Sequence, residues 1–293
     1  MTIYNLGSIN IDKVLRVPHL PSPGETLAAR SYAEGLGGKG ANQSVAAARA
    51  GAQVVHLGAI GPDGGAMLDL LARDGVATDR IARLPVPTGM ALIMVDDAAE
   101  NTIAILAGAN REIPQDGVTA ALEGARRGDT LLLQNETGGQ VAAAEQARSR
   151  GMRVVVSAAP FDMAALAPLL PLLSVLLLNE VEAAQLEQAA GRSLAALALP
   201  HVVVTRGARG ATHLDGGTGE STTYPAFRVA PVDTTGAGDT FAGYLAAGLD
   251  QGLDWSRALP RAQAAAALSV TRAGAAASIP GAAETAEFLA KAG

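Results

Sequence analysis

The regular alternation of short apolar runs with longer helical runs constrains the fold of this chain more than any other feature. Five short runs rich in Val and Leu have the continuous apolar character of strands that are covered on both faces, and they lie at 54–58, 130–134, 153–157, 175–178 and 202–205. Candidate helices occur at 41–50, 66–74, 115–125, 140–150 and 180–189. The pattern predicts a three-layer α/β/α fold, with helices on both faces of a mainly parallel sheet.

Two stretches break this alternation and contain no candidate helix. Residues 11–33 include Pro18, Pro21 and Pro23, and residues 89–107 hold two strand-like runs, 90–96 and 102–106, around a polar turn. The second stretch is typical of a β-hairpin. We expect 11–33 and 89–107 to form a small β-sheet lid, and 1–10, 34–88 and 108–293 to form the α/β domain. A pair of decorated surface loops is the alternative.

Composition excludes several classes of partner and site. The 293 residues suffice for one large α/β domain or two smaller ones. The 22 Lys and Arg residues against 28 Asp and Glu residues give a net charge of −6, and the basic residues are scattered, so we expect no nucleic-acid partner. The absence of cysteine excludes disulfides and thiolate metal sites, and it fits a reducing cytoplasm. The four histidines lie far apart in the sequence, without metal-ligand spacing.

We expect no membrane segment. The N-terminus lacks the basic start and apolar block of a signal peptide, and residues 3–9 have the pattern of a strand instead. The longest apolar segment, 163–178, is short for a membrane crossing and is interrupted by Pro168 and Pro171. It predicts a helix followed by a buried strand, and the chain as a whole is expected to be cytoplasmic.

The segment 232–241, VDTTGAGDTF, places a carboxylate beside a glycine turn at a helix start. Gly236 and Gly238 can adopt dihedral angles closed to other residues, and Ala237 begins an apolar run of helical period. The free amides of a helix start attract anions. Asp239 could therefore take a proton from a hydroxyl that attacks a phosphate held there. Alternatively, Asp239 only satisfies the helix N-terminus.

A second glycine cluster, GLGGKGANQ at 35–43, runs into a helix. Its literal G-x-G-x-x-G pattern does not predict a dinucleotide fold, because the proline-rich stretch separates it from the first strand. It is not a P-loop, since Gly40 follows Lys39. Lys39 and Asn42 could reach the hydroxyls of a sugar. A tight turn with a solvated lysine is the structural alternative.

Three further segments place polar residues after predicted strands. Asn10 and Asp12 follow the first strand, where ligands of open α/β sheets collect, although such residues are often turn formers. Residues 179–182, NEVE, open a helix, and on local grounds they are explained well as its cap. Their position after a central strand hints at a role in binding a cation or a phosphate. The glycine turn at 205–210, TRGARG, could contact a nucleotide.

The two glycine motifs together resemble those of the ribokinase-like (PfkB) carbohydrate kinases, and most closely those of the ribokinases among them. The motifs are GGKGANQ at 37–43 and DTTGAGDTF at 233–241, and the resemblance extends from the first strand to about Pro280. It implies transfer of a phosphoryl group from MgATP to a sugar hydroxyl, catalysed mainly by positioning and charge stabilisation. It also implies that the small sheet closes over the site and joins two subunits into a homodimer.

The resemblance assigns roles to individual residues. Asp239 would be the catalytic base, and the amides of Gly236, Ala237 and Gly238 would form the anion hole. The residues that would bind the sugar are Asn10, Asp12, Gly38, Lys39, Asn42, Glu136 and Asp239. Those that would bind ATP and place magnesium are Asn179, Glu182, Thr205, Gly207, Gly210, Gly238 and Gln263. A monovalent cation such as K⁺ would lie among Asp233, Thr235, Ser269, Arg272, Gly274 and Ser278.

The chain also departs from the family pattern at two places. Residues 134–138 read QNETG, where ribokinases usually have apolar residues beside the glutamate and a proline soon after. Gln263 stands where many relatives have histidine or asparagine near the adenine. We expect an ATP-dependent kinase that phosphorylates the 5-hydroxyl of D-ribose. The alternatives are a kinase for deoxyribose, a ketose or a nucleoside, a non-catalytic sugar sensor, and a dinucleotide oxidoreductase.

Overall fold

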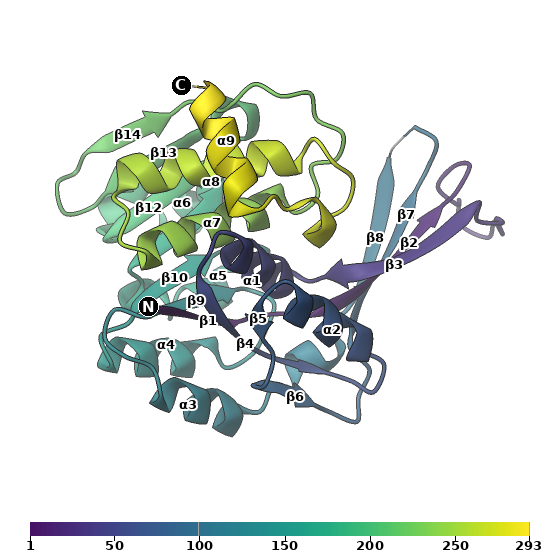
Figure 1. The fold of residues 1–293 in the computed structure, drawn as a ribbon, viewed down its shortest axis with the longest axis horizontal. Helices are drawn as coiled ribbons and strands as arrows, with labels where there is room; N and C mark the ends of the chain where they lie inside the picture. The colour runs from purple at the N-terminus through teal and green to yellow at the C-terminus, as the bar shows by residue number, and fades with distance from the viewer. Residues whose placement is uncertain (99, 293) are drawn as a thin grey trace.

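The computed structural model describes residues 1–98 and 100–292, and ten strands in this part of the chain form one sheet through the centre of the molecule (Figure 1). The strand order is β14-β13-β12-β11-β10-β9-β1-β4-β5, with β6 also paired to β4. All neighbours from β12 to β5 are parallel, and β13 and β14 add an antiparallel edge. The strands are β1 (Thr2–Leu6), β4 (Gln53–Ile60), β5 (Val76–Ala77), β6 (Ile81–Arg83), β9 (Thr130–Gln134), β10 (Arg153–Ser157), β11 (Val175–Asn179), β12 (His201–Thr205), β13 (Ala211–Asp215) and β14 (Ser221–Tyr224).

Helices cover both faces of this sheet, and alternate residues of each strand supply two separate cores. Leu132 of β9 packs with one set of helices, while Leu131 and Leu133 pack with the other. The first set is α1 (Lys39–Arg49), α2 (Gly65–Arg73), α7 (Ala237–Asp250) and α8 (Trp255–Ser269), with α9 (Ala282–Ala292) packed outside α8. The second is α3 (Gln115–Glu123), α4 (Gln140–Ser149), α5 (Met163–Leu166) and α6 (Glu180–Ala190). The predicted α/β/α fold class is confirmed.

The segment 163–178 differs from its prediction. A helix was expected before the strand, but α5 has only four residues, and a 3-10 turn at Leu170–Leu172 replaces its continuation. Pro168 and Pro171 explain the difference, because proline lacks the amide that a longer helix would need. The strand that follows begins at Val175, as predicted.

A separate sheet of four strands, in the order β3-β2-β7-β8, projects from the body (Figure 1). It consists of β2 (Asn10–Arg16), β3 (Ser31–Gly37), β7 (Gly89–Val95) and β8 (Asn101–Leu106). The predicted hairpin is confirmed, since β7 and β8 pair antiparallel. The first strand was expected at 3–9, but β1 ends at Leu6 and Asn10 already belongs to β2. β3 likewise extends four residues, 34–37, beyond the range expected for the small sheet.

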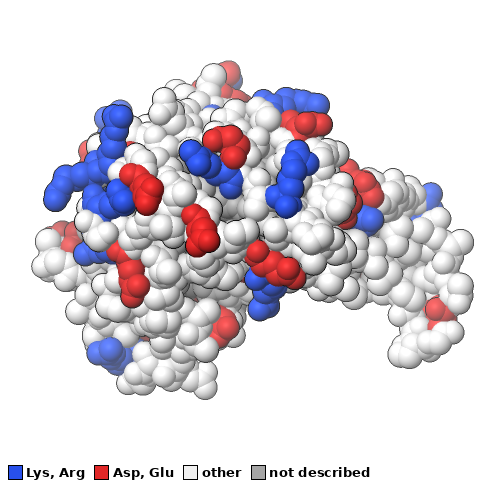
Figure 2. All heavy atoms as spheres, turned by 90° about the horizontal axis from the view of Figure 1, so that it is seen from below, with Lys and Arg blue, Asp and Glu red and all other residues white. Residues whose placement is uncertain are grey.

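The small sheet exposes apolar side chains as well as charged ones. Figure 2 shows acidic and basic side chains interspersed over one face of the body, and few charged side chains on the face of the projecting sheet that is seen in this view. Large apolar side chains are exposed there, including Tyr32 and Ile105. Within residues 1–98 and 100–292, no helix combines the length and the apolar character needed to span a bilayer.

The contact between α1 and α7 brings the two glycine motifs together. Gly243 of α7 lies so close to α1 that an added Cβ would be 2.5 Å from both the Ala46 Cβ and the Gln43 carbonyl oxygen. Gly40 makes a similar approach at the start of α1, where a Cβ would be 2.4 Å from Gly7. Glycine at these two positions therefore sets how closely α1 packs on α7 and on the end of β1.

We predict that Gly243→Ala destabilises the protein by about 1–3 kcal/mol, because α1 and α7 must separate to admit the methyl group. The measurement is the free energy of unfolding in urea. Gly117→Ala is the matched control, since an added Cβ on this exposed residue of α3 meets nothing within 4 Å. It should be neutral or stabilising by up to about 1 kcal/mol. Equal effects of the two substitutions would contradict this account of the interface.

Candidate active site

A cleft of about 230 Å³ lies where the carboxyl ends of the parallel strands meet the start of α7. Ligands of open α/β sheets bind at this edge. The residues predicted from separate segments that line it are Lys39, Asn179, Glu182, Thr205, Gly236, Gly238 and Asp239. Leu177, Leu178 and Phe241 supply part of its apolar wall. The structure therefore places both glycine motifs and two of the predicted nucleotide segments around one cavity.

The first turn of α7 presents backbone amides to this cleft. Gly236 is the N-cap in the left-handed conformation, with φ of 73°, and Thr240 donates the first helical hydrogen bond to the Gly236 carbonyl. The Ala237 amide donates to the Thr234 carbonyl at 3.3 Å, and the amides of Gly238 and Asp239 occupy helix positions that lack a partner four residues back. A Cβ added to Gly238 would meet nothing within 4 Å, so the space above this turn is open. This geometry suits an anion.

The Asp239 side chain points to α1 and does not cap its own helix. Its Oδ2 accepts from Asn42 Nδ2 at 3.1 Å, and its Oδ1 accepts from Gln43 Nε2 at 3.0 Å. Burial raises the pKa of Asp239, and this effect outweighs the opposing influence of the Lys39 ammonium and the two amide donors. The result is a carboxylate with a fixed orientation and an increased affinity for a proton.

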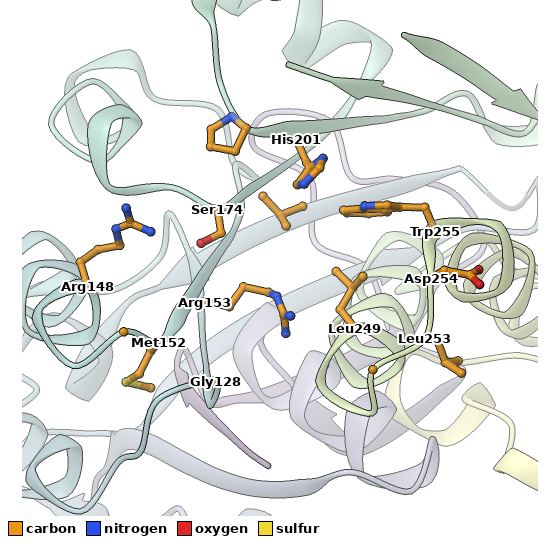
Figure 3. A pocket seen from close by; sticks show the side chains of 14 residues that line it. Gly128, Arg148, Met152, Arg153, Ser174, His201, Leu249, Leu253, Asp254 and Trp255 are labelled. Carbon is orange, nitrogen blue, oxygen red and sulfur yellow. The ribbon is translucent and has the colours of Figure 1, made fainter. Parts of the chain in front are cut away.

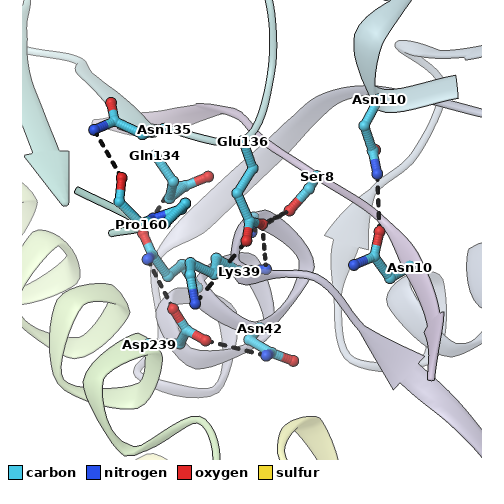
Figure 4. A network of polar contacts seen from close by, with 12 residues as sticks. Ser8, Asn10, Lys39, Asn42, Asn110, Gln134, Asn135, Glu136, Pro160 and Asp239 are labelled. Atoms are coloured by element: carbon cyan, nitrogen blue, oxygen red, sulfur yellow. Dashed lines mark hydrogen bonds and ion pairs between the residues drawn. The ribbon is translucent and has the colours of Figure 1, made fainter. Parts of the chain in front are cut away.

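Lys39 and Glu136 extend the polar network from Asp239 (Figure 4). The Lys39 backbone amide donates to Glu136 Oε2 at 3.2 Å, and its ammonium lies 3.9 Å from Glu136 Oε1. The Ser8 hydroxyl also donates to Glu136. Figure 4 shows the Lys39 side chain between the carboxylates of Glu136 and Asp239. The Lys39 ammonium thus acts electrostatically on two carboxylates that come from different parts of the chain.

Asn10 and Asp12 reach the site from the small sheet and not from the end of the first strand. Asp12 lies against Gly37, where a Cβ would be 1.9 Å from the Asp12 Oδ1. Burial, reinforced by Glu136 and Asp239, raises the pKa of Asp12 to about 6. Asp12, Glu136 and Asp239 are therefore close enough to influence one another. Gly38, with φ of 90°, forms the turn between the small sheet and α1.

Asn42 has an acceptor that the protein does not satisfy. Its side chain is buried and its Nδ2 donates to Asp239, while its Oδ1 has no hydrogen-bond partner among the described residues. An unpaired buried oxygen is costly. A hydroxyl donor of a bound ligand would remove that cost, and this observation fits the predicted contact with a sugar.

A buried chain of side chains behind Asp239 was missed by the sequence analysis. Gln43 Oε1 accepts from Gln134 Nε2 at 2.8 Å, and the same Nε2 donates to Asn5 Oδ1 at 3.0 Å. Asn5 in turn donates to Ser44, whose hydroxyl contacts His56. These contacts fix the orientation of the Gln43 amide, and hence of the donor to Asp239. The signal was Gln134 at the end of an otherwise apolar strand, since a buried amide needs a partner.

Asn110 is the second missed residue. It is buried, and its Nδ2 donates to Asn10 Oδ1 at 2.8 Å while its own Oδ1 accepts from the Ile9 amide at 2.9 Å. A Cβ at Gly89 would collide with this pair of amides. Asn110 therefore holds Asn10 at the junction of the small sheet and the body. No local pattern around Asn110 distinguished it in the sequence.

The predicted nucleotide residues are only partly brought together. Asn179 and Glu182 form a reciprocal capping box at 2.9 and 2.8 Å, as the cap interpretation predicted, and both also line the cleft. Thr205 lines it too, and Gly207 and Gly210 follow in a tight turn with positive φ. Gln263 does not line this cleft. It is buried, and its Nε2 donates to the Tyr224 carbonyl at 2.9 Å, so it bridges α8 to β14.

The predicted monovalent-cation residues lie beside the glycine turn of α7. The Asp233 carboxylate accepts from the amides of Thr235 and Gly274, each at 2.9 Å. Burial acts to raise the pKa of Asp233, but these hydrogen bonds together lower it. The loops join further through the Asp233 amide, which donates to the Val270 carbonyl at 3.1 Å. Ser269 and Ser278, which flank Gly274 in the sequence, are buried. The Arg272 side chain pairs with Glu284 at the surface.

Comparisons with known proteins place this geometry in a family. Residues 2–282 match the pfkB family carbohydrate kinases. A ribokinase of Haemophilus influenzae is 39% identical, over 98% of this chain and 98% of its own length. The chain belongs to the pfkB family of carbohydrate kinases.

Two further relatives are similar to this chain over nearly their whole length. A deoxyribokinase of Salmonella typhi is 32% identical over 99% of both chains. The crystal structure of a ribokinase from Cryptococcus neoformans in complex with ADP superimposes with a TM-score of 0.87 and 32% identity, covering 98% of this chain and 99% of that one. The chain is thus a phosphotransferase with an alcohol group as acceptor, in a family that uses ATP as the phosphate donor.

We predict that Asp12→Asn stabilises the ligand-free protein at neutral pH. The pKa of Asp12 is about 6 in the folded protein against an ordinary 3.8, so ionisation of this acid costs stability above that pH. The cost decreases as the pH falls through 6 and vanishes below the ordinary value. The substitution should raise the free energy of unfolding by about 1–3 kcal/mol at about pH 7.5, and by little at about pH 4.

The measurement is urea denaturation at the two pH values. Asp69→Asn, on the exposed face of α2, is the control for loss of a negative charge and should change the free energy of unfolding little. A free energy of unfolding that is unchanged or lower for Asp12→Asn at the higher pH would show that Asp12 is not strained by burial.

Proposed function

We propose that this protein transfers the γ-phosphoryl group of ATP to the 5-hydroxyl of D-ribose, with Asp239 as the base. The observation that carries the proposal is the position of the Asp239 carboxylate. It is held by Asn42 and Gln43 of α1 in a cleft that also contains the open first turn of α7. A hydroxyl placed between these groups would face a proton acceptor on one side and anion-binding amides on the other.

The reaction requires little covalent chemistry of the protein. Asp239 accepts the hydroxyl proton as the sugar oxygen forms its bond to the γ-phosphorus, and the bond from that phosphorus to the bridging oxygen breaks to release ADP. The amides of Gly236, Ala237 and Gly238 stabilise charge on the transferred group. The raised pKa of Asp239 strengthens it as a proton acceptor. Positioning and electrostatics thus supply the catalysis.

The sugar would be bound by the polar groups between the small sheet and α1. In this proposal they are Asn10, Asp12, Gly38, Lys39, Asn42 and Glu136. Asn10 has its Oδ1 occupied by Asn110, so its amide group is left to donate, while Asn42 Oδ1 is left to accept. The 39% identity to a ribokinase, against 32% to a deoxyribokinase, favours ribose. Deoxyribose, a ketose or a nucleoside is the alternative acceptor on the same fold.

ATP would lie along the carboxyl ends of β11 and β12. We assign its contacts to Asn179, Glu182, Thr205, Gly207, Gly210 and Gly238. The adenine ring would point toward Gln263. Glu182 uses one oxygen in the capping box, which leaves Oε1 for a magnesium ion or its water. Mg²⁺ bound there would neutralise phosphate charge. A single carboxylate oxygen suits an ion that takes its remaining ligands from phosphate and water.

A monovalent cation, K⁺, would lie in the loops around Asp233. Carbonyl oxygens and one carboxylate are suitable ligands for such an ion. The Asp233 side chain is fixed by two amides, and Gly236 packs on Ala275 in the adjoining loop. The other proposed contributors are Thr235, Ser269, Arg272, Gly274 and Ser278. The bound charge would act next to the anion-binding turn and favour its conformation.

We further propose a homodimer formed through the small sheet, and a cytoplasmic reaction, where ATP is supplied. β8 is exposed along its length, with Ile103 50% and Ile105 66% exposed, and Tyr32 on β3 is 54% exposed. Apolar side chains clustered on one projecting sheet are typical of an interaction surface. A second copy of the sheet would cover them.

We predict that Asp239→Asn lowers the turnover number about 10²- to 10⁴-fold, because asparagine cannot accept the hydroxyl proton. Binding of ribose should persist, since the amide can still pair with Asn42. The measurements are ADP release in the presence of Mg²⁺ and calorimetry with ribose. Turnover within tenfold of the wild type would exclude Asp239 as the base. An inactive wild-type protein that still binds sugar would favour the sensor alternative.

We predict that kcat/KM is highest for D-ribose in a panel with 2-deoxyribose, fructose and inosine. A site built to hydrogen-bond a hydroxyl discriminates strongly against an analogue without it, because its buried polar groups are left unpaired. A preference for inosine would overturn the assignment of a free sugar.

We predict that Asn42→Ala raises KM for ribose more than about tenfold, since it removes the unpaired acceptor Oδ1 that the sugar would satisfy, and leaves KM for ATP within about threefold.

A further inference from the structure

A second and larger cavity, of about 580 Å³, lies at the opposite edge of the central sheet from the candidate active site. It is bounded by the beginnings of β10, β11 and β12, the end of α7 and the beginning of α8 (Figure 3). Leu249 in its wall follows Asp239 by ten residues of the same helix, which corresponds to about 15 Å. The cavity is therefore separate from the proposed phosphoryl transfer.

Arg153 provides an incompletely paired cation in this cavity. It begins β10, and Figure 3 shows its guanidinium group at the centre of the cavity, near Leu249. Among the described residues its side chain forms one hydrogen bond, a long contact of 3.4 Å from Nη1 to Thr130 Oγ1. Burial lowers the pKa of Arg153, partly offset by Asp250, and the guanidinium stays charged. Most of its five donors remain available to a ligand.

Trp255 provides a flat apolar wall. Its indole ring is held by His213, which stacks on it with ring centroids 4.0 Å apart, and by His201 at 4.8 Å. The two histidines are 12 residues apart in sequence, and the antiparallel pairing of β12 with β13 brings their rings together. Burial lowers the pKa of both, that of His213 to about 4, so both are neutral at physiological pH. The charge offered to a ligand is thus that of arginine.

The acids near the cavity do not satisfy Arg153. The Asp254 carboxylate accepts from the Ser256 hydroxyl at 2.7 Å and the Arg257 amide at 3.0 Å, as the cap of α8. The Asp250 carboxylate accepts from Thr130 at 3.2 Å, and burial raises the pKa of Asp250. Arg148 lines the cavity as well, from the exposed surface of α4. The charged residues that line the cavity are Arg148, Arg153 and Asp254, so the fixed charge of its lining is positive.

We propose that this cavity is a binding site for a small planar organic carboxylate. The carboxylate accepts a two-pronged hydrogen bond from Arg153, a pairing that matches the geometry of both groups. The planar body lies between Trp255 and Leu249 and buries apolar surface. The volume falls within the range of small-molecule sites, roughly 300–1,000 Å³. Binding supplies partners to the partly unpaired, half-buried guanidinium.

The chain contains one tryptophan, so its fluorescence reports on this cavity alone. The probe is benzoate, with benzamide as the neutral ligand of the same shape. Benzoate should change Trp255 fluorescence saturably, with millimolar affinity, and benzamide should bind at least tenfold more weakly. Saturating ribose and a non-hydrolysable ATP analogue should leave the benzoate titration unchanged. Competition by either, or no saturable response to benzoate, would overturn the proposal.

Substitutions in the protein provide the second test. Arg153→Met should weaken benzoate at least tenfold, and Arg153→Lys should weaken it less, because the ammonium keeps the charge without the two-pronged geometry. Arg150→Met is the matched control, since Arg150 donates to the Glu123 carbonyl and does not line the cavity. It should bind benzoate like the wild type. Thermal unfolding of each variant checks that it is folded, and undiminished binding by Arg153→Met would refute the site.

Discussion

The packing of α7 on α1 is the contact on which the rest of the site depends. It brings Asp239 to Asn42 and Gln43, although nearly two hundred residues separate these positions, and it leaves the first amides of α7 facing the cleft. The contact is close because Gly243 presents no side chain to α1. Since the carboxylate is oriented by a neighbouring helix and not by its own, a small separation of the two helices would release Asp239 without unfolding either one.

Glycines serve two different purposes around this contact. Gly40 and Gly243 allow close approach of backbone, and Gly37 leaves the space that the Asp12 carboxylate occupies. Gly238 differs, because an added Cβ would meet nothing there and packing gives no reason for a glycine. The absence of a side chain at that position keeps the helix amides accessible. Glycine thus allows close packing in the motif at 37–43, whereas in the motif at 233–241 Gly238 leaves space for a ligand.

The sequence predicted the layers of the fold because continuous apolar runs and helical periods are local signals. β9 and β10 begin and end at the predicted residues, and the β7–β8 hairpin follows from alternation alone. The roles of Gln43 and Asn110 could not be predicted in this way, since each depends on partners about a hundred residues away or more. The proximity of His201 and His213 likewise depends on strand pairing. Local patterns locate elements, whereas only the assembled sheet decides which polar side chains meet.

The acidic residues of the cleft lower the stability of the folded protein. Asp12, Glu136 and Asp239 influence one another, and Lys39 is the ammonium that acts on all three. Burial raises the pKa of both Asp12 and Asp239, so keeping them ionised opposes folding. The buried chain from Gln43 through Gln134 to Asn5 resists the relaxation that would relieve this strain, because each amide is fixed by the next. A ligand with several hydroxyl donors would satisfy these acceptors together, so binding energy and the relief of strain come from the same contacts.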